Sequence, residues 1–445
     1  MQVHPKKVKS KITVIGGGLA GVEAAYQIAK QGIAVDLHEM RPQVMTEAHG
    51  SDFLAEMVCS NSLGSNEITS ASGLLKRELK TLDSFFLRYA EKFKVPAGNS
   101  LSVDRMQLAA AITGELTALP GVTIKRQEVK EIPTADLPLV IASGPLTSPD
   151  FARSLSGLTM RKNLFFFDAT CPLLRAESID FSKLFAASRY EKGDADFFNI
   201  SLDEGQYASF VQNLVQAETV EVRDFEKNVF FDACLPVEEI ARRGVQSLAF
   251  GPLKPVGLID PRNQRRPYAV VQLRQDDLKK NFYQLVGFQT RLKHGDQKRI
   301  FRMLPGLEDA EFERFGRMHR NTYINAPLII NQFSQYKKND RIYFAGQLSG
   351  VEGYVESVAS GLWCGLSAGR AASGRPLPAL PETTALGSLL GYISHADWND
   401  FRPTKFTFGL LADSGVECRD KKRKKEMKAE RAGEALEQWV RKSAI

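Results

Sequence analysis

Apolar residues near the N-terminus are arranged as a strand, a helix and a second strand. Ile12 to Ile15 form a short apolar run, a glycine-rich turn follows, and an alanine-rich segment then shows helical spacing. A second apolar run, Ala34 to Leu37, leads to Glu39. Two short apolar runs joined by a helical segment predict a βαβ unit with parallel strands.

The turn after the first strand carries glycine at three positions that spell G-x-G-x-x-G: Gly16, Gly18 and Gly21. Gly16 permits the tight turn, Gly18 lets the backbone approach a pyrophosphate, and Gly21 lets the helix pack closely on the strand. The helix N-terminus favours phosphate charge, and Glu39 is placed to accept hydrogen bonds from a ribose diol. The combination predicts a dinucleotide site. The alternative is a glycine-rich turn in an ordinary βαβ unit.

A second nucleotide-binding pattern lies about 330 residues later. Ile342 to Ala345 form an apolar strand that ends at Gly346, and a long helix of small residues starts near Gly353. In flavoproteins such a late element commonly places its helix N-terminus at the flavin. The two elements together favour FAD over NAD, because NAD enzymes typically need only the first. Simple βα packing is the alternative.

Two helices and a buried strand are predicted between these elements. Residues 73–92 and 101–118 show helical spacing, and residues 137–145 read as an apolar strand that ends in Ser-Gly-Pro. A strand that ends in this way often returns the chain to the edge of a bound dinucleotide.

The pattern changes from about residue 198, where a strand and a helix are followed by two alternating strands. This segment reads as an inserted module that rejoins the first domain near residue 320. The predicted fold is therefore α/β, a Rossmann-like FAD-binding domain of the glutathione-reductase type with an inserted α+β domain. We expect residues 1–197 and 320–445 to form the FAD-binding domain and residues 198–319 the inserted domain.

Composition is typical of a soluble globular protein. Of the 445 residues, 43% are hydrophobic and 25% are charged. No apolar run reaches the ~18 residues that a membrane helix needs, and the basic N-terminus lacks a signal-peptide core. We therefore expect a cytoplasmic protein without a membrane partner, and the length predicts about two to four domains.

The net charge of +7 and the pI of about 9.0 suggest an anionic partner. Basic residues gather at residues 262–274, at residues 291–302, and in the run KKRKK at 421–425, which opens a final charged helix. A single run is more often a solvated face, but together the runs are typical of RNA or DNA binding. The side chains expected to contact such a nucleic acid, which is RNA if the family resemblance described below holds, are Arg262, Arg265, Arg266, Arg274, Lys293 and Arg299.

The cysteines are odd in number and widely spaced. Without a C-x-x-C pair, neither a zinc knuckle nor a local redox disulfide is indicated, and no metal site is expected. A reducing compartment fits, with any special cysteine working as a thiol. The five are Cys59, Cys171, Cys234, Cys364 and Cys418.

Many sequence blocks match one known family over nearly the whole chain. They include VIGGGLAG, EMRP, LAEMVCSNSL, VPAGNSLSVDR, FFDACLPVEE, FGPLKPVGLIDPR, MHRNTYINAP and FAGQLSGVEGYVESVASG. On these blocks the chain resembles the bacterial folate- and FAD-dependent tRNA (uracil-5-)-methyltransferases, relatives of the larger glucose-inhibited-division flavoproteins. Coincidence over blocks of this length and number is negligible.

The resemblance implies an enzyme that takes a methylene group from 5,10-methylenetetrahydrofolate and places it on C5 of a T-loop uridine in tRNA. Electrons from NAD(P)H then reduce this group, and 5-methyluridine is formed. Such chemistry needs a thiol, because a thiolate that adds to C6 of uracil makes the poorly nucleophilic C5 reactive. A base must afterwards remove the proton from C5.

By block match, the family's two functional cysteines fall on Cys59 and Cys234. Cys234 is our choice for the nucleophile, and Cys59 for an acid/base or capping role near the flavin, but the sequence leaves the two roles exchangeable. Tyr354 falls where the family places an aromatic ring against the flavin. The residues expected to contact the cofactor are Gly16, Gly17, Gly18, Leu19, Ala20, Gly21, Glu39, Arg41, Gly346, Gly353 and Tyr354.

The chain departs from the family at residues 401–411, where FRPTKFTFGLL stands in place of a pattern close to FQPMNINFGL. Arg402, Lys405 and Thr407 replace uncharged or amide side chains, so exact folate or RNA contacts there stay open. Three alternatives also remain: the same chemistry on a ribosomal RNA uridine, wobble-uridine modification by a related flavoprotein, and a flavin-bearing RNA-binding protein without essential catalysis. We favour a monomer.

Overall fold

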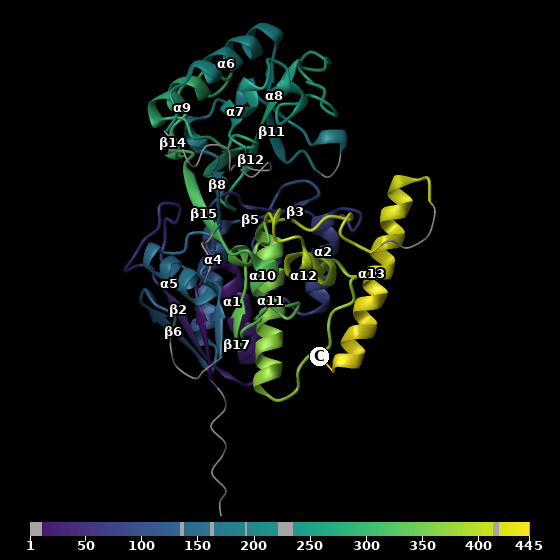
Figure 1. Ribbon diagram of the computed structural model, residues 1–445. Helices are drawn as coiled ribbons and strands as arrows, with labels where there is room; N and C mark the ends of the chain where they lie inside the picture. Colours follow the sequence, from purple (N-terminus) through teal and green to yellow (C-terminus); the bar gives the residue numbers. More distant parts are fainter. Residues whose placement is uncertain are drawn as a thin grey trace, which may run out of the picture.

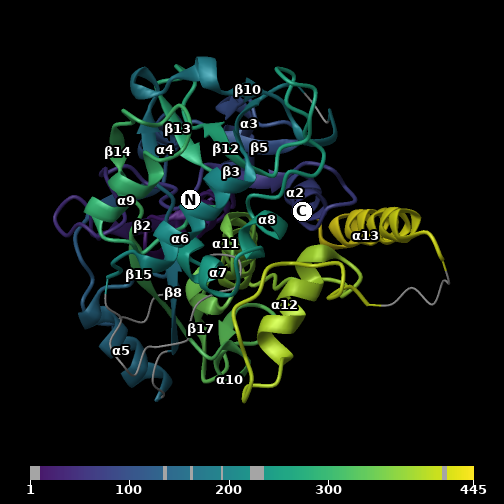
Figure 2. The same ribbon diagram turned by 90° about the horizontal axis from the view of Figure 1, so that it is seen from above.

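The computed structural model describes residues 11–133, 138–160, 164–191, 194–220, 235–412 and 418–444. They form two bodies, the first domain below and the inserted domain above in Figure 1. An antiparallel ribbon of β8 (Leu164–Ala169) and β15 (Met318–Tyr323) connects them. Seen from above, the inserted domain lies over the first domain (Figure 2).

The first domain is built on a six-stranded sheet with the order β16-β17-β7-β1-β2-β6. All neighbouring strands run parallel except β16 and β17. The central strands are apolar because helices and loops cover both faces of a parallel sheet. The bounds are β1 (Lys11–Ile15), β2 (Ala34–Glu39), β6 (Val122–Arg126), β7 (Leu139–Ile141), β16 (Gln335–Tyr336) and β17 (Asn339–Phe344).

Helices α1 (Leu19–Lys30) and α11 (Tyr354–Ala372) pack against each other in the first domain. A Cβ atom on Gly361 would lie 2.3 Å from the carbonyl oxygen of Ala20, and one on Gly365 would lie 2.6 Å from that of Ala24. Only glycine permits such an approach. The small residues of the late helix therefore bring its N-terminus to the same end of the sheet as the G-x-G-x-x-G turn.

The inserted domain has its own antiparallel sheet with the order β10-β11-β12-β13-β9-β14, and its own apolar core. Two of its strands precede residue 198, so this sheet begins earlier in the chain than the sequence predicts. They are two or three residues long, too short to show an alternating pattern. The bounds are β9 (Leu173–Arg175), β10 (Phe185–Ala186), β11 (Phe197–Leu202), β12 (Ala269–Gln275), β13 (Phe282–Leu285) and β14 (Phe312–Arg314).

A small sheet of the order β3-β5-β4 lies at the top of the first domain, facing the inserted domain. Its strands are β3 (Ser62–Ser65), β4 (Lys94–Val95) and β5 (Ser100–Val103). The remaining helices are α2 (Ala71–Thr81), α3 (Phe85–Lys92), α4 (Arg105–Ala118), α5 (Pro149–Thr159), α6 (Glu204–Gln216), α7 (Val237–Arg242), α8 (Ser247–Phe250), α9 (His294–Phe301), α10 (Ala326–Ile329), α12 (Ala385–His395) and α13 (Lys421–Ser443).

The helix predicted over residues 73–92 is broken into α2 and α3. Asp83 adopts a positive φ of 57°, and Ser84 caps the second helix. The carboxylate of Glu23 on α1 accepts hydrogen bonds from the backbone of Phe85 and Phe86. A tertiary contact thus satisfies the start of α3, which helical spacing alone does not reveal. Similarly, the predicted helix 101–118 begins only at Arg105, after strand β5.

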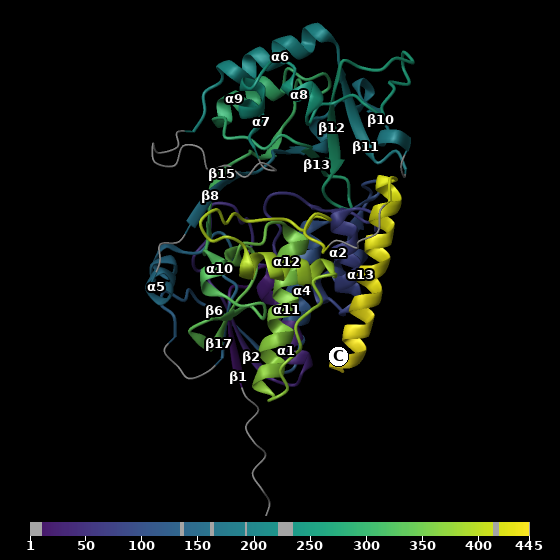
Figure 3. The ribbon, with the colours of Figure 1, turned by 45° about the vertical axis from the view of Figure 1, so that its right-hand side comes forward.

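The last helix, α13, runs along the flank of the first domain (Figure 3). It begins at Lys421, as the basic run predicts, and its N-terminal end points toward the inserted domain. Trp439 anchors the other end against Trp363, with ring centroids 5.8 Å apart. None of the helices that the structure describes is both long enough and apolar enough to span a membrane.

Candidate functional site

A cleft of about 780 Å³ opens at the carboxyl ends of β1 and β7. In open parallel sheets, ligands bind at the point where successive strands depart in opposite directions, and β1 with its neighbours β2 and β7 forms such a point. Both predicted nucleotide-binding patterns contribute to its wall. Eight of the expected cofactor residues line it: Gly16, Gly18, Leu19, Ala20, Glu39, Arg41, Gly346 and Tyr354.

The three glycines of the turn have different surroundings. Gly16 has a φ of 106°, and a Cβ atom there would lie 2.2 Å from the carbonyl oxygen of Ala142. A Cβ atom on Gly21 would lie 1.7 Å from the carbonyl oxygen of Gly16. By contrast, a Cβ atom on Gly18 would meet nothing within 4 Å, because this glycine faces the open cleft. Gly16 and Gly21 thus shape the turn, and Gly18 leaves room for a ligand.

Glu39 ends β2 and is 6% exposed. Its carboxylate accepts hydrogen bonds from the backbone N–H of Gly17 at 2.9 Å and from Arg41 Nε at 2.9 Å. Burial alone would raise the pKa of Glu39, but the charge of Arg41 and these hydrogen bonds lower it overall. Arg41 also reaches Glu56, at 3.1 Å. Arg41 therefore holds Glu39 ionised at the cleft, where the carboxylate can accept hydrogen bonds from a ribose diol.

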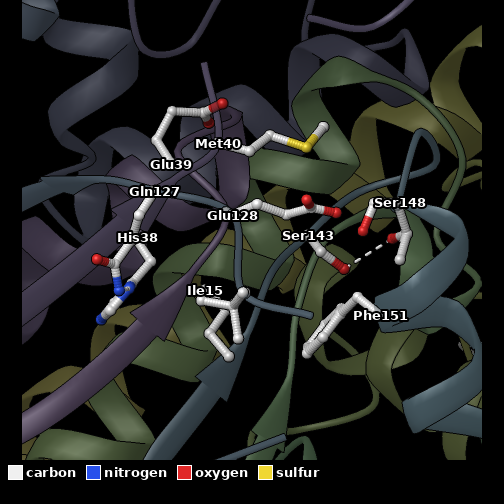
Figure 4. A pocket seen from close by; sticks show the side chains of 12 residues that line it. Ile15, His38, Glu39, Met40, Gln127, Glu128, Ser143, Ser148 and Phe151 are labelled. Carbon is white, nitrogen blue, oxygen red and sulfur yellow. Dashed lines mark hydrogen bonds between the residues drawn. The ribbon is translucent and has the colours of Figure 1, made fainter. Parts of the chain in front are cut away.

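A smaller pocket of about 390 Å³ adjoins Glu39 (Figure 4). Apolar side chains, among them Ile15 and Phe151, line it together with polar ones from three segments of the chain. Ser143 and Thr147 share a hydrogen bond of 2.7 Å at its edge. A pocket with apolar walls beside a carboxylate suits a planar base with polar edges, such as adenine.

A second and larger cavity of about 1150 Å³ adjoins the cleft; the first domain and the β8–β15 ribbon form most of its wall, and Gln289 of the inserted domain completes it. The two spaces share part of their walls: Val58, Pro145, Gln347 and Tyr354. Cys59 opens into this second cavity, as do Gly353 and Glu352. A ligand that extends from the cleft past Tyr354 would therefore arrive at the thiol.

Tyr354, the first residue of α11, is in contact with the backbone around Cys59. Its hydroxyl oxygen accepts hydrogen bonds from the N–H of Cys59 at 2.8 Å and of Ser60 at 3.2 Å. The Cys59 thiol donates to the carbonyl oxygen of Ala169 at 3.6 Å. The late nucleotide-binding element and the thiol predicted to be functional thus form one site.

Besides the charged side chains of Asp168 and Lys405, the cavity wall carries two buried titratable groups that are largely uncharged at neutral pH, Glu352 and His319. Burial, and then the negative charge of Asp168, raise the pKa of Glu352 to about 8, so this carboxyl group is largely protonated. Burial lowers the pKa of His319, so the imidazole is neutral. Within the described chain, His319 Nδ1 and the Asn321 amide are buried without a hydrogen-bond partner. Unpaired buried polar atoms are costly, and an uncharged heterocyclic ligand would satisfy them.

Glu352 and Asn321 are not predicted from the sequence. Both occupy blocks that match the family, FAGQLSGVEG and MHRNTYINAP, but a glutamate or an asparagine in a loop or strand has no distinctive spacing. The signal that identifies them is tertiary, since they meet only where β15 and the turn before α11 come together.

Cys234, the predicted nucleophile, lies outside the described residues. Of the others, Cys171 and Cys364 are buried, at 4% and 0% exposed. Burial raises the pKa of the Cys171 thiol to about 12, with a further contribution from Cys59 nearby. Cys364 sits in the core of α11, as expected for a structural thiol.

The structure separates the six predicted RNA-contacting side chains into two groups. Arg265 and Arg266 are exposed on the surface of the inserted domain. Arg262, Lys293 and Arg299 are exposed there too, although each forms an ion pair, and Arg274 alone among the six is turned inward. Arg262 pairs with Asp260, Lys293 with Glu218 and Arg299 with Asp296, at 2.6 to 2.7 Å.

Arg274 differs most from its prediction. Its guanidinium is turned inward and donates to Ser60 Oγ at 2.7 Å and to Gln284 Oε1 at 2.6 Å. This inward position beside Ser60 does not fit a phosphate contact on the surface. The prediction for Arg274 rested on its place in a basic cluster, and that place does not reveal which face of β12 a side chain occupies.

Comparisons with known proteins give one consistent result. Residues 11–376 match the family model described as glucose inhibited division protein A. Proteins named methylenetetrahydrofolate–tRNA-(uracil-5-)-methyltransferase TrmFO are similar over nearly their full length. The one from Anoxybacillus flavithermus is 49% identical, covering 97% of this chain and 100% of the relative. The one from Heliobacterium modesticaldum is 50% identical, covering 98% and 99%.

Among solved structures, GidA of Aquifex aeolicus has a similar fold. The TM-score is 0.68 at 14% sequence identity, with 97% of this chain and 74% of that chain covered. At this identity the likeness concerns the fold alone, and it agrees with the predicted flavoprotein architecture.

Proposed function

We propose that this chain, which belongs to the glucose inhibited division protein A family and within it to the methylenetetrahydrofolate–tRNA-(uracil-5-)-methyltransferases, forms 5-methyluridine in tRNA. The family resemblance predicted from the sequence is confirmed. The observation that carries the proposal is the shared wall of the cleft and the cavity, which places the Cys59 thiol beyond the dinucleotide site.

The cleft fits FAD. Open space at Gly18 admits the pyrophosphate, Glu39 can accept hydrogen bonds from the ribose, and the pocket beside it suits the adenine. The N-terminus of α11 at Gly353 and Tyr354 would face the isoalloxazine end. Bound there, FAD would supply the reducing equivalents that convert the transferred methylene group to a methyl group, with NAD(P)H as the source of electrons.

The remaining chemistry belongs to residues of this chain. A thiolate must add to C6 of the target uracil, and we assign this role to Cys234. Cys59 then acts as the acid/base that takes the proton from C5. The uncharged polar groups of Glu352 and His319 would bind the pterin ring of 5,10-methylenetetrahydrofolate. The target uridine has to leave its RNA stack to reach a thiol that lies in a cavity.

The exposed arginines of the inserted domain provide a test of RNA binding. Replacing Arg265 and Arg266 together with glutamate should weaken tRNA binding at least about tenfold and reduce the slope of log K against log salt by about 2, because two phosphate contacts are lost. Filter binding at several salt concentrations measures both quantities.

The single variant Arg265→Glu has a control of equal charge change in Arg153→Glu on α5, an arginine with a side chain 74% exposed in the first domain. The affinity of Arg153→Glu for tRNA should stay near the wild-type value. Equal losses in both single variants would point to net charge alone rather than to a site on the inserted domain.

The proposed function is tested directly with purified protein. We expect yellow protein with bound FAD that forms 5-methyluridine in a tRNA transcript when 5,10-methylenetetrahydrofolate and NADPH are supplied. Mass spectrometry of digested nucleosides gives the product. A ribosomal RNA transcript in a parallel reaction distinguishes the alternative substrate. Flavin-loaded protein that methylates neither RNA would contradict the proposal.

A further inference from the structure

The segment that carries Cys59 is held by side chains from both domains. We call residues 57–61 the Cys59 loop. On one side, Tyr354 of the first domain accepts the hydrogen bond of the Cys59 N–H. On the other side, Gln284 Nε2 of the inserted domain donates to the Cys59 carbonyl oxygen at 2.9 Å. Both backbone polar groups of Cys59 are thus fixed, each by a different domain.

Gln284 is 1% exposed and lies on β13. The orientation of its amide is set by Arg274 on the neighbouring strand β12, which donates to Gln284 Oε1 at 2.6 Å. Since the amide oxygen faces the guanidinium, the amide nitrogen faces Cys59. The same Arg274 nitrogen also donates to Ser60 Oγ. Arg274 and Gln284 therefore hold two consecutive residues of the loop.

Two further contacts link the loop region to the inserted domain. Asn61 Nδ2 donates to the carbonyl oxygen of Gln275 at 3.0 Å. Arg105, which donates to the carbonyl oxygen of Met57 at 3.2 Å, forms a buried ion pair with Asp276 at 2.6 Å. The end of β12 and the Cys59 loop thus behave as one polar interface between the domains.

We propose that Gln284, oriented by Arg274, is a positioning residue through which the inserted domain fixes the Cys59 thiol in the cavity. Its part in methyl transfer rests on the proposed function, but its effect on the thiol does not. Placement of a reacting group within about 1 Å affects turnover by as much as about a hundredfold. Neither residue would touch the substrate in this role.

The test uses two substitutions of Gln284 in the full-length, FAD-loaded protein. Gln284→Glu keeps the size and the contact with Arg274 but places a carboxylate oxygen against the Cys59 carbonyl oxygen. Gln284→Met keeps the length without a donor or a charge, and it decides the question if the glutamate variant does not fold.

The matched control is Gln272→Glu on β12. The Gln272 amide has the same kind of surroundings, because its oxygen accepts from Arg189 Nε at 3.0 Å and its nitrogen donates to Asn199 Oδ1 at 2.9 Å. It contacts no residue of the Cys59 loop through these hydrogen bonds. Any general cost of a carboxylate beside an arginine in this sheet should therefore appear in the control as well, although Gln272 is less deeply buried than Gln284.

Two readouts are needed. The first is methylation, where we expect kcat to fall about 10- to 100-fold per bound FAD, with the KM for tRNA within about twofold of wild type. The second is alkylation of Cys59 by iodoacetamide, followed by peptide mass spectrometry. We expect its rate to rise at least about threefold, because a released loop exposes the thiol more often. Gln272→Glu should change neither.

The possible results separate the two proposals. If the wild type methylates RNA and the Gln284 variants match Gln272→Glu in both readouts, the positioning role is wrong and the proposed function stands. If the wild type methylates no RNA but iodoacetamide still alkylates Cys59 faster in the Gln284 variants than in the wild type, the positioning role stands and the proposed function is wrong. A rise in the KM for tRNA with unchanged kcat in the Gln284 variants would also overturn the positioning role, because that result would indicate that Gln284 contributes to substrate binding.

Discussion

Replacing Cys59 with alanine should abolish the formation of 5-methyluridine, with a loss of at least about 1,000-fold in kcat, while FAD binding is retained. The fold and FAD binding should survive because the backbone of Cys59 makes its two main hydrogen bonds: its N–H donates to Tyr354, and its carbonyl oxygen accepts from Gln284. Alanine keeps both, so the loop stays in place and only the thiol is lost. Flavin absorbance and nucleoside mass spectrometry measure the two quantities separately.

Cys364→Ala is the control for this prediction, because it removes a thiol that is fully buried in α11 and away from the cavity lining. It should lower stability by about 1 kcal/mol and leave turnover near the wild-type value. Wild-type turnover in Cys59→Ala would remove Cys59 from the chemistry.

The same variant can assign the two thiols. If Cys234 is the nucleophile, Cys59→Ala should still form a covalent complex with RNA that carries 5-fluorouridine, visible on a denaturing gel, whereas Cys234→Ala should not. The reverse pattern would exchange the two roles.

The second large effect is expected at the glycines of the turn. Gly21→Ala places a methyl carbon 1.7 Å from the carbonyl oxygen of Gly16. This oxygen belongs to the backbone, so it cannot move aside as a flexible side chain would. Strand β1 and helix α1 must then separate. We expect a loss of roughly 3 kcal/mol in the free energy of unfolding, together with loss of FAD.

Gly18→Ala is its counterpart, because an added methyl group meets no protein atom within 4 Å and the φ of −73° suits any residue. The free energy of unfolding should change by about 1 kcal/mol or less. FAD affinity should nevertheless fall roughly tenfold, since the methyl group occupies the space for the pyrophosphate. Urea unfolding measures the free energy of unfolding, and flavin titration measures the affinity for FAD, in both glycine variants. Wild-type affinity in Gly18→Ala would show that the cleft is not the pyrophosphate site.

Local patterns predicted the elements on which the site is built. The strand, turn and helix around Gly16, and the late strand and helix around Gly346, occur where apolar spacing and glycines indicate. These signals are local, because a tight turn and a close helix contact each require glycine at a fixed position. The division of residues 73–92 into two helices was not predictable, since it depends on the carboxylate of Glu23 on another helix.

The basic residues show the limit of reading charge from sequence. Arg265 and Arg274 belong to one cluster along the chain, yet one is exposed and the other holds the Cys59 loop. Net charge predicts that the protein has an anionic partner, but it does not predict which arginines are free to contact it. That depends on the side of the strand and on acidic neighbours such as Asp260 and Asp296.

By itself, the sequence determined the flavoprotein class, because the glycine turn is complete within one short run, and the family, because matching blocks extend over nearly the whole chain. Only the tertiary structure decided what surrounds Cys59. Tyr354 and Gln284 lie 295 and 225 residues away from Cys59 along the chain. The first binds its backbone N–H and the second its carbonyl oxygen. Hydrogen bonds between such distant segments depend on how two domains pack, and no local pattern carries that information.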